Sequence, residues 1–576
     1  MKLEYVLIAL LISGAVFGLY LRNAPFTGGN IDVEAPPLRT SYDVFANTEH
    51  VKWIYDSEQS YYLAPARAGG INAINAQNPL YYVLIATFTK LTNISPYQTT
   101  YLVLNLLSVF IVLCVFVIAN RAFGINVAIV SAFFGFFPQA HWLFPMYIGF
   151  QYDYHTYTML AGVFFLLVYM LAKKEFNEDL YVAVIAGILL AGIVLSHYSE
   201  LFFFAPFIGL VTAIILFFRE YSFVKKSAIL AVPFIIAAAF FLYYYPLTLN
   251  VHLTGGFTGQ LSNQINPERA RHLDYFPWPR FNMPMNLLAV LGIITIVISG
   301  ISGKVDKKRL LALGILVYIL FVGTSNYTLN VWANRAERQL FLGHSFFVML
   351  PALGIIGITT LLTKNNRLAV LAAVLISIIS IPYLVYGQTF NTLTEMGRLT
   401  YFDDDKWNAV RWIRDNTPKD ARVFFINGYI HEFQMFAERV ELKGDLNLGH
   451  TQENIKLLCS KQWPDTVVGD WGFRDPPKQG FLTRRLGWNK FDYALPFQNT
   501  SHPFTSMNTT SQDKVQLSFF DYVVVQHTGN DGFDQCMQWF VAESNSKNYT
   551  IIFSNQKMAV LKKEIPSSPL AHSGIS

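Results

Sequence analysis

Charged side chains are scarce in this sequence. Asp, Glu, Lys and Arg together make up 14% of the 576 residues, whereas about 25% is usual for soluble domains. The mean hydropathy is correspondingly positive, at +0.33. These values exclude an ordinary soluble globular chain and indicate a polytopic membrane protein. The net charge of +5 is small for this length, and the basic residues are scattered over short loops, so the composition gives no indication of a nucleic-acid partner.

Cysteine is also rare, with three residues in the chain. Cys114 lies in an apolar run, where a thiol packs as a small apolar group. Cys459 and Cys536 both lie in the polar C-terminal part. They could form a disulfide if that part faces an oxidising compartment, and two free thiols are the alternative. The sequence contains no internal repeat of fixed period and no low-complexity tract.

Long apolar runs fill the first two thirds of the chain. A transmembrane helix needs about 20 predominantly apolar residues. Runs of this kind predict about eleven spanning helices, at 4–22, 99–119, 125–143, 156–172, 180–196, 201–218, 227–246, 285–302, 310–325, 341–362 and 368–386. The first run follows a single Lys, as a signal peptide would. No A-x-A cleavage site follows it cleanly, so we interpret it as an uncleaved first span.

The short connections between these runs alternate in charge, which predicts the orientation of the chain. One set carries Lys and Arg, and the other set, around 138–155 and 197–200, carries none. By the positive-inside rule the basic set is cytoplasmic. The N-terminus is then cytoplasmic, and the chain beyond about residue 387 is extracytoplasmic. The basic set comprises Arg121, Lys173, Lys174, Arg219, Lys225, Lys226, Lys304, Lys307, Lys308, Arg309, Lys364 and Arg367.

Glycosylation sequons agree with this orientation. N-x-S/T triplets begin at Asn93, Asn326, Asn499, Asn508 and Asn548, and all fall in segments predicted to lie outside. Such triplets also occur by chance, so they support the orientation without proving it. The location predicted is an integral membrane protein of the cell membrane, or of the endoplasmic reticulum membrane in a eukaryote.

The fold class predicted is a polytopic α-helical membrane protein with a soluble C-terminal domain. Residues 1–386 would form the transmembrane domain, in which 23–98 is the first external loop. Within that loop, the apolar run after Asn78 is too short to span and is expected to lie flat at the interface. Residues 387–576 would form an extracytoplasmic α/β or α+β domain. Its start, 403–428, is typical of an amphipathic helix, a Thr-Pro turn and a strand.

Acidic residues gather in segments predicted to lie on the outer side. The first external loop contains Asp43 and His50 among several acids, and Asp153 and His155 lie at the mouth of a predicted span. A charge near hydrocarbon is costly and is functional by default. One reading is a solvated acid within an aromatic interfacial belt. The other is that Asp153 and a first-loop acid converge, where two carboxylates could bind a divalent ion or act as a general base.

Arginines occur on the same predicted side. Arg335 and Arg338 precede a late span, and Arg271 lies in a third external loop. These side chains either snorkel to the lipid headgroups or bind phosphate, whose oxygens match the planar guanidinium. A rim with both acids and arginines fits a substrate that has an anionic linkage and a neutral reacting group.

Three motifs, taken in order, are similar to those of a known superfamily. The first is Tyr42-Asp43 followed by His50, with "NPLYYVL" at 78–84 closing the loop, where Asn78 replaces a Pro of the usual pattern. The second is Tyr152-Asp153 at the start of a span, and the third is "ERQLFL" at 337–342 before a late span. Over roughly residues 1–390 the chain resembles the GT-C membrane glycosyltransferases, in particular the group that uses dolichyl- or polyprenyl-phosphate sugars, as protein mannosyltransferases do.

The resemblance implies a sugar transferase acting outside the cytoplasm, with a lipid-linked donor and a protein, glycan or lipid-linked glycan as acceptor. It implies that Asp43 is the general base of an inverting transfer, with Asp153 and His50 completing the catalytic set. Arg338, with Arg335 and Arg271, would bind the donor phosphate. It leaves open a divalent metal, Mg²⁺ or Mn²⁺, held by Asp43 and Asp153.

Two alternatives remain at this stage. Within the same superfamily, the chain could be the catalytic subunit of an oligosaccharyltransferase, since "GFQYDYH" at 149–155 is not far from a motif of those enzymes. Their acceptor-binding Trp-Trp-Asp-Tyr-Gly motif is poorly matched by "GDWGF" at 469–473. A transporter or lipid flippase is the alternative of another class, but it would carry charges at mid-membrane and repeated halves.

Overall fold

The computed structural model divides into two compact units. The first comprises Met1–Ile31, Pro37–Ser41 and Gln77–Thr400, and the second Asp32–Pro36, Tyr42–Ala76 and Tyr401–Ser576. The residues that the structure describes are 3–27, 51, 55, 63–64, 73–74, 79–136, 153–172, 175–196, 201–244, 283–301, 348–363, 366–385, 404–418, 421–425, 440–442, 459–469, 513–526 and 531–564.

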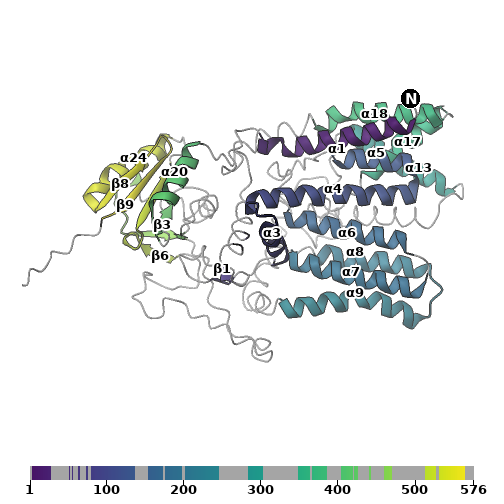
Figure 1. Ribbon diagram of the computed structural model, residues 1–576, viewed down its shortest axis with the longest axis horizontal. Helices are drawn as coiled ribbons and strands as arrows, with labels where there is room; N and C mark the ends of the chain where they lie inside the picture. Colours follow the sequence, from purple (N-terminus) through teal and green to yellow (C-terminus); the bar gives the residue numbers. More distant parts are fainter. Residues whose placement is uncertain are drawn as a thin grey trace, which may run out of the picture. The chain divides into compact units, whose positions relative to one another are not determined.

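The first unit is a bundle of apolar helices (Figure 1). Every apolar run expected from the sequence overlaps one of them, except 310–325, which lies outside the described residues, as do 137–143 and 341–347. The helices are α1 (Leu3–Thr27), α3 (Pro79–Thr92), α4 (Pro96–Phe123), α5 (Ile125–Phe136), α6 (Asp153–Leu171), α7 (Phe176–Ser196), α8 (Leu201–Phe217), α9 (Phe223–Tyr244), α13 (Met283–Ile301), α17 (Met349–Thr363) and α18 (Asn366–Val385).

Apolar side chains fill the core of the bundle and also lie on its outer surface. Ile235 on α9, Phe217 on α8 and Leu362 on α17 are 64%, 79% and 79% exposed. Exposing such surface to water costs about 25 cal/mol per Å², so the natural surroundings of these faces are hydrocarbon. Among the described helices, α4, α7 and α9 are each long and apolar enough to cross a membrane. The bundle is that of an integral membrane protein.

Glycines set the closest helix contacts. A Cβ at Gly354 of α17 would lie 2.0 Å from the carbonyl oxygen of Leu288 on α13, so only glycine lets the two backbones approach this far. Gly292 of α13 faces Gly354, and Thr295, one turn further on, faces Gly357. Both contacts advance in the same direction along the two helices. Helices α13 and α17 therefore run parallel.

The second unit is built on a mixed sheet in the order β4-β3-β7-β9-β8. Strand β3 pairs in parallel with β4 and β7, whereas β9 pairs antiparallel with β7 and β8. Two antiparallel pairs, β1 with β2 and β5 with β6, are separate. The strands are β1 (Leu63–Ala64), β2 (Ala73–Ile74), β3 (Arg422–Phe425), β4 (Val440–Leu442), β5 (Thr466–Gly469), β6 (Asp513–Gln516), β7 (Tyr522–Gln526), β8 (Tyr549–Ser554) and β9 (Met558–Lys563).

Helices cover both faces of this sheet. On one face, Trp407 and Ile413 of α20 (Asp404–Asn416) pack against Val524 of β7. On the other, Met537 and Phe540 of α24 (Asp531–Glu543) pack against alternate residues of the same strands. Alternation along a strand sends successive side chains to opposite faces, which explains why β7 reads as an unbroken apolar run. The unit is a three-layer α/β arrangement.

A disulfide ties α24 to the segment before β5. It joins Cys459 and Cys536, which are 77 residues apart in sequence. Beside it, the ring of Trp463 stacks on Phe540 with centroids 4.5 Å apart. The cross-link and the stacked rings thus fasten one strand segment to the helix that covers the sheet.

Candidate functional site

One predicted catalytic residue lies on a described element. Asp153 is the first residue of α6, where a carboxylate is favoured by the helix dipole. The other predicted site residues, Asp43, His50, Arg271, Arg335 and Arg338, lie outside the described residues. The structure therefore shows which element carries Asp153.

Short connections determine which residues share an end of the bundle. Helices α6, α7, α8 and α9 follow one another with only a few residues between them, so neighbours run antiparallel. Asp153 is consequently at the same end as the link from Ser196 to Leu201. The links from α6 to α7 and from α8 to α9 are at the opposite end.

Helix α3 is the second feature of the Asp153 end. It packs against α4 and α7 and lies across the end of the bundle in Figure 1. Its 14 residues give a length of about 21 Å, too short for the roughly 30 Å hydrocarbon core. Tyr82 and Ile85 are buried against the bundle, whereas Leu91 is 77% exposed. These are the properties expected of a helix lying at the membrane interface.

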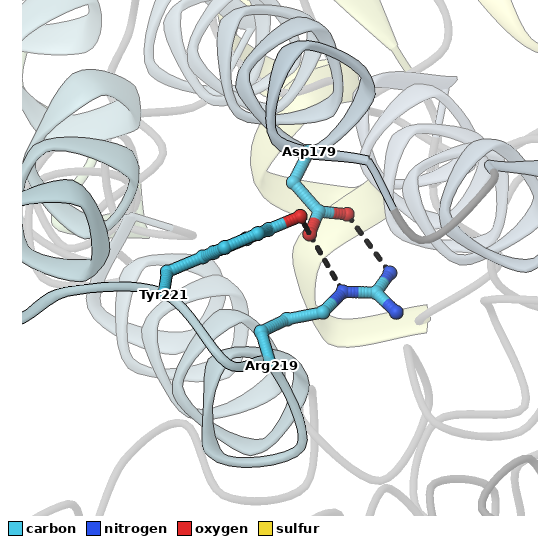
Figure 2. Close-up of polar contacts among 3 residues, drawn as sticks. All are labelled: Asp179, Arg219 and Tyr221. Atoms are coloured by element: carbon cyan, nitrogen blue, oxygen red, sulfur yellow. Dashed lines mark hydrogen bonds and ion pairs between the residues drawn. The ribbon is translucent and has the colours of Figure 1, made fainter.

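The opposite end of the bundle contains a compact polar cluster (Figure 2). Asp179, in the first turn of α7, accepts two hydrogen bonds from Arg219, from Nε at 2.7 Å and from Nη2 at 3.0 Å. The hydroxyl of Tyr221 donates a third, at 3.0 Å. The side chains of Arg219 and Asp179 are 8% and 2% exposed. The sequence predicted Arg219 only as a member of the cytoplasmic basic set, and Asp179 was not predicted. The available signal was an acid directly before the apolar run at 180–196.

The electrostatics of this cluster are those of a closed ion pair. Burial and the hydrogen bond to Asp179 raise the pKa of Tyr221 to about 12. Burial alone would lower the pKa of Arg219, but the hydrogen bond and charge of Asp179 raise it overall. Nearby, Nζ of Lys225 lies 4.9 Å from the ring centroid of Phe176. The carboxylate is matched by a cation and a hydroxyl, so the cluster fastens α7 to the α8–α9 link and leaves no reactive group.

A metal centre is the remaining kind of site to consider. Within the described ranges, no three His, Cys, Asp or Glu side chains gather closely enough to hold a metal ion.

No family model matches the sequence, and no curated protein sequence matches it either. The structure is similar to archaeal oligosaccharyltransferase AglB from Archaeoglobus fulgidus in complex with an inhibitory peptide and a dolichol-phosphate. The TM-score is 0.52 at 13% identity, over 91% of this chain and 69% of that one. The chain has the fold of a GT-C membrane glycosyltransferase.

Two further structures agree with this fold. The Archaeoglobus fulgidus enzyme in complex with Zn and sulfate gives a TM-score of 0.52 at 14% identity, over 94% of this chain and 71% of that one. ArnT from Cupriavidus metallidurans in the apo state gives 0.50 at 10% identity, over 96% and 98%. The GT-C fold predicted from the sequence motifs is confirmed. The chain spans 64% of another structure of the archaeal enzyme, tethered to an acceptor peptide.

Proposed function

We propose that this chain is a membrane glycosyltransferase that moves a sugar from a polyprenyl- or dolichyl-phosphate carrier to an acceptor hydroxyl outside the cytoplasm. The observation that carries the proposal is the GT-C fold over nearly the whole chain, shared with enzymes of that chemistry. One of the similar structures contains a dolichol-phosphate. A lipid-linked donor cannot leave the bilayer cheaply, because each buried methylene is worth about 0.8 kcal/mol. An enzyme for such a donor must work at the membrane surface.

The chemistry follows from the residues assigned at the outer end. Asp43 takes the proton of the acceptor hydroxyl, and the oxygen attacks the anomeric carbon of the donor sugar. The bond to the lipid phosphate breaks, and the phosphate leaves with the bonding electrons. Arg338, with Arg335 and Arg271, stabilises the charge on that phosphate. Asp153 and His50 orient the base and the acceptor, and the single displacement inverts the anomeric configuration.

A divalent metal is a separate part of the proposal. Asp43 and Asp153 are carboxylates, the ligands that Mg²⁺ prefers, and a similar archaeal structure contains Zn. Asp43 lies outside the described residues, so these two carboxylates are the proposed ligands of such an ion. The ion would help to neutralise the charge on the leaving phosphate.

The topology proposed has eleven spans, with residues 1–386 as the catalytic domain, the N-terminus inside and 387–576 outside. Parallel α13 and α17 support it, because two parallel spanning helices need an odd number of crossings between them. The disulfide between Cys459 and Cys536 supports an oxidising surrounding for the second unit. Basic residues support it as well, since Arg121 lies in the last turn of α4 and Arg219 and Lys225 lie at the α8–α9 link.

An oligosaccharyltransferase is the second candidate. It is favoured by the two archaeal structures with a TM-score of 0.52. In that case the acceptor is the side-chain amide of an Asn, and not a hydroxyl. The ArnT structure, which has nearly the same chain length, favours the first candidate.

A reconstituted assay tests the proposal. Purified protein in liposomes is supplied with polyprenyl-phosphate sugars, and the products are read by mass spectrometry. We expect Asp43→Asn and Asp153→Asn each to lower transfer at least 100-fold, within the range that a general base contributes. Arg338→Ala should raise the KM for the donor more than that for the acceptor. Glu220→Gln is the control, because Glu220 lies exposed at the opposite end of the bundle.

Two outcomes would contradict the proposal. Full activity in both Asp variants would overturn the assignment of the site. Transfer to the amide of an Asn-containing peptide, without transfer to any hydroxyl acceptor, would favour the oligosaccharyltransferase. Comparing lipid-linked and surface glycans with and without this protein would then identify the sugar and its acceptor.

A further inference from the structure

A glycosylation sequon occupies a tight turn of the second unit. Asn548, Tyr549 and Thr550 form the triplet N-x-T, the acceptor for N-linked glycans. Asn548 lies between the short helix η6 (Ser544–Lys547) and β8, in a left-handed conformation with φ 63°. Asn is one of the few residues that adopt this conformation readily. The turn exposes Asn548 to solvent.

The backbone of Asn548 is held on both sides. Its N–H donates to the carbonyl oxygen of Ser544, and its own carbonyl accepts from the N–H of Glu564 at 2.8 Å. The side-chain amide makes no hydrogen bond to any other residue that the structure describes. The site is thus a rigid backbone that presents a free carboxamide. A glycan is bulky and must lie on the surface, so it can be attached here without disturbing the fold.

Side chains along β8 point alternately into the core and away from it, so Tyr549 and Thr550 have different surroundings. Tyr549 is buried in the core, and its hydroxyl donates to the carbonyl of Leu517 at 3.0 Å. Thr550, the next residue, is only partly buried, and its hydroxyl donates to the carboxylate of Glu564. Strand geometry therefore turns the middle residue inward and leaves the two residues that define the sequon accessible.

A second sequon within the described residues provides a contrast. Asn93 is also exposed and left-handed, with φ 54°. Its Ser95, however, caps α4 by accepting a hydrogen bond from the N–H of Gln98 at 3.3 Å, and Pro96 follows at once. The triplet links α3 and α4, two apolar helices, at the end of the bundle where α3 lies at the membrane interface. A polar glycan attached there would meet lipid headgroups. The triplet at Asn548 is followed by Ile551 and not by a proline, and it lies in the second unit.

We infer that Asn548 is an N-glycosylation site of this protein. The reaction forms a bond between Nδ2 of Asn548 and the anomeric carbon of a lipid-phosphate-linked glycan. The bond from that carbon to the phosphate oxygen breaks, the lipid phosphate leaves with the electron pair, and Nδ2 loses a proton. The disulfide of the same unit is of the kind that forms in an oxidising, non-cytoplasmic compartment. The inference rests on the outside location of the second unit and is independent of the transferase activity.

The experiment uses full-length protein purified from native membranes. Mass spectrometry of the peptide that contains Asn548 should show a glycan, which enzymatic deglycosylation removes. Asn548→Asp should abolish the glycan, because Asp has no amide nitrogen to carry it. The turn should be kept, because Asp also adopts the left-handed conformation readily. Thr550→Val should abolish the glycan too, because it removes the hydroxyl and keeps the β-branched shape. Thr550→Ser and Asn545→Gln, which leave the sequon intact, should keep the glycan.

Thermal unfolding of each variant separates loss of the sequon from loss of the fold. An unmodified Asn548 peptide from the native membrane would overturn the inference, and so would a glycan that persists in Thr550→Val. Transfer activity is measured separately in the reconstituted assay. A protein that lacks the glycan but transfers sugar would refute this site alone, and a glycosylated but inactive protein would refute the proposed function alone.

Discussion

Asp179 shows how one buried carboxylate is held at the end of an otherwise apolar helix. Its two oxygens accept hydrogen bonds from Nε and Nη2 of Arg219 and from the hydroxyl of Tyr221 (Figure 2). A buried ion pair is not a strong source of stability, because desolvation offsets most of the attraction. Removing only one partner is costly, since the other charge is then buried without compensation.

We therefore expect Asp179→Asn to lower the stability of the protein by about 3–5 kcal/mol. The measurement is the unfolding temperature of the detergent-solubilised protein. Glu220→Gln also replaces a carboxylate by an amide, at the exposed position next to Arg219. It should change stability by less than about 1 kcal/mol. The double variant Asp179→Leu with Arg219→Met should recover much of the loss. Equal effects of Asp179→Asn and Glu220→Gln would show that the ion pair is not buried within the protein.

Tyr549 gives a prediction for pH dependence. Its burial, and secondarily the charge of Asp521, raise its pKa to about 12, compared with about 10 in an unfolded chain. The folded state holds this proton more tightly, so the stability it contributes is complete below pH 10 and falls as the pH rises from about 10 to 12.

The measurement compares wild type with Tyr549→Phe over that pH range. At pH 8, wild type should unfold at the higher temperature, because the variant leaves the carbonyl of Leu517 without its donor. The difference should shrink above pH 10. The other tyrosines titrate in both proteins and cancel in the comparison. Parallel curves up to pH 12 would mean that the hydroxyl of Tyr549 is not buried.

Among the elements, α13 and α17 make the closest approach that the glycines reveal. Gly354→Ala would place a methyl group 2.0 Å from a backbone oxygen of α13, and backbone cannot rotate away as a side chain can. We expect a loss of stability of at least about 1–3 kcal/mol, measured as the unfolding temperature in detergent.

Gly209→Ala in α8 is the matched control. The nearest atom to its added Cβ is Cζ of the Phe234 ring, at 3.3 Å, and this side chain is partly exposed and able to shift. Ala is favoured over Gly in a helix by about 1 kcal/mol, so this variant should be neutral or stabilised. A stable Gly354→Ala protein would show that the two helices are further apart than the structure has them.

The elements differ in how far the sequence predicts them. The apolar runs predicted the helices because spanning length and hydropathy are local properties. The amphipathic stretch, Thr417-Pro418 turn and following strand likewise appear as α20 and β3. The strand order of the second unit was not predictable, since β3 pairs with β4 and with the distant β7. Such pairings depend on contacts far apart in sequence, which no local pattern encodes.

For the whole molecule, the sequence predicted the GT-C fold through motifs that each involve a few residues, and the comparisons confirm the fold. It did not predict the Asp179 cluster, because that cluster depends on Arg219 and Tyr221 meeting α7 in space. Of the predicted site, Asp153 begins α6 as a span-initiating acid should. The roles of Asp43, Asp153, His50, Arg271, Arg335 and Arg338 stay predictions.

The orientation of the whole chain can be tested with single cysteines. In a background in which Cys114 is Ala and the disulfide is kept, Thr92→Cys marks the end of α3, Lys547→Cys marks the second unit and Glu220→Cys marks the α8–α9 link. All three positions are exposed. If the proposed topology holds, a membrane-impermeant thiol reagent should label the first two from outside sealed vesicles of known orientation. It should label Glu220→Cys only after the membrane is permeabilised.

The physical reason is that α3 and α4 join at the end of the bundle opposite the α8–α9 link, with a hydrocarbon layer between them that a charged reagent cannot cross. The Cys114→Ala parent without an added cysteine is the control. Cys114 is the only free thiol among the described residues, so this parent should not be labelled. Labelling of Thr92→Cys and Glu220→Cys from the same side would contradict the alternation of the helices. Labelling of Lys547→Cys only from the cytoplasmic side would place the second unit inside, and would remove the basis for both the outer catalytic site and the glycan at Asn548.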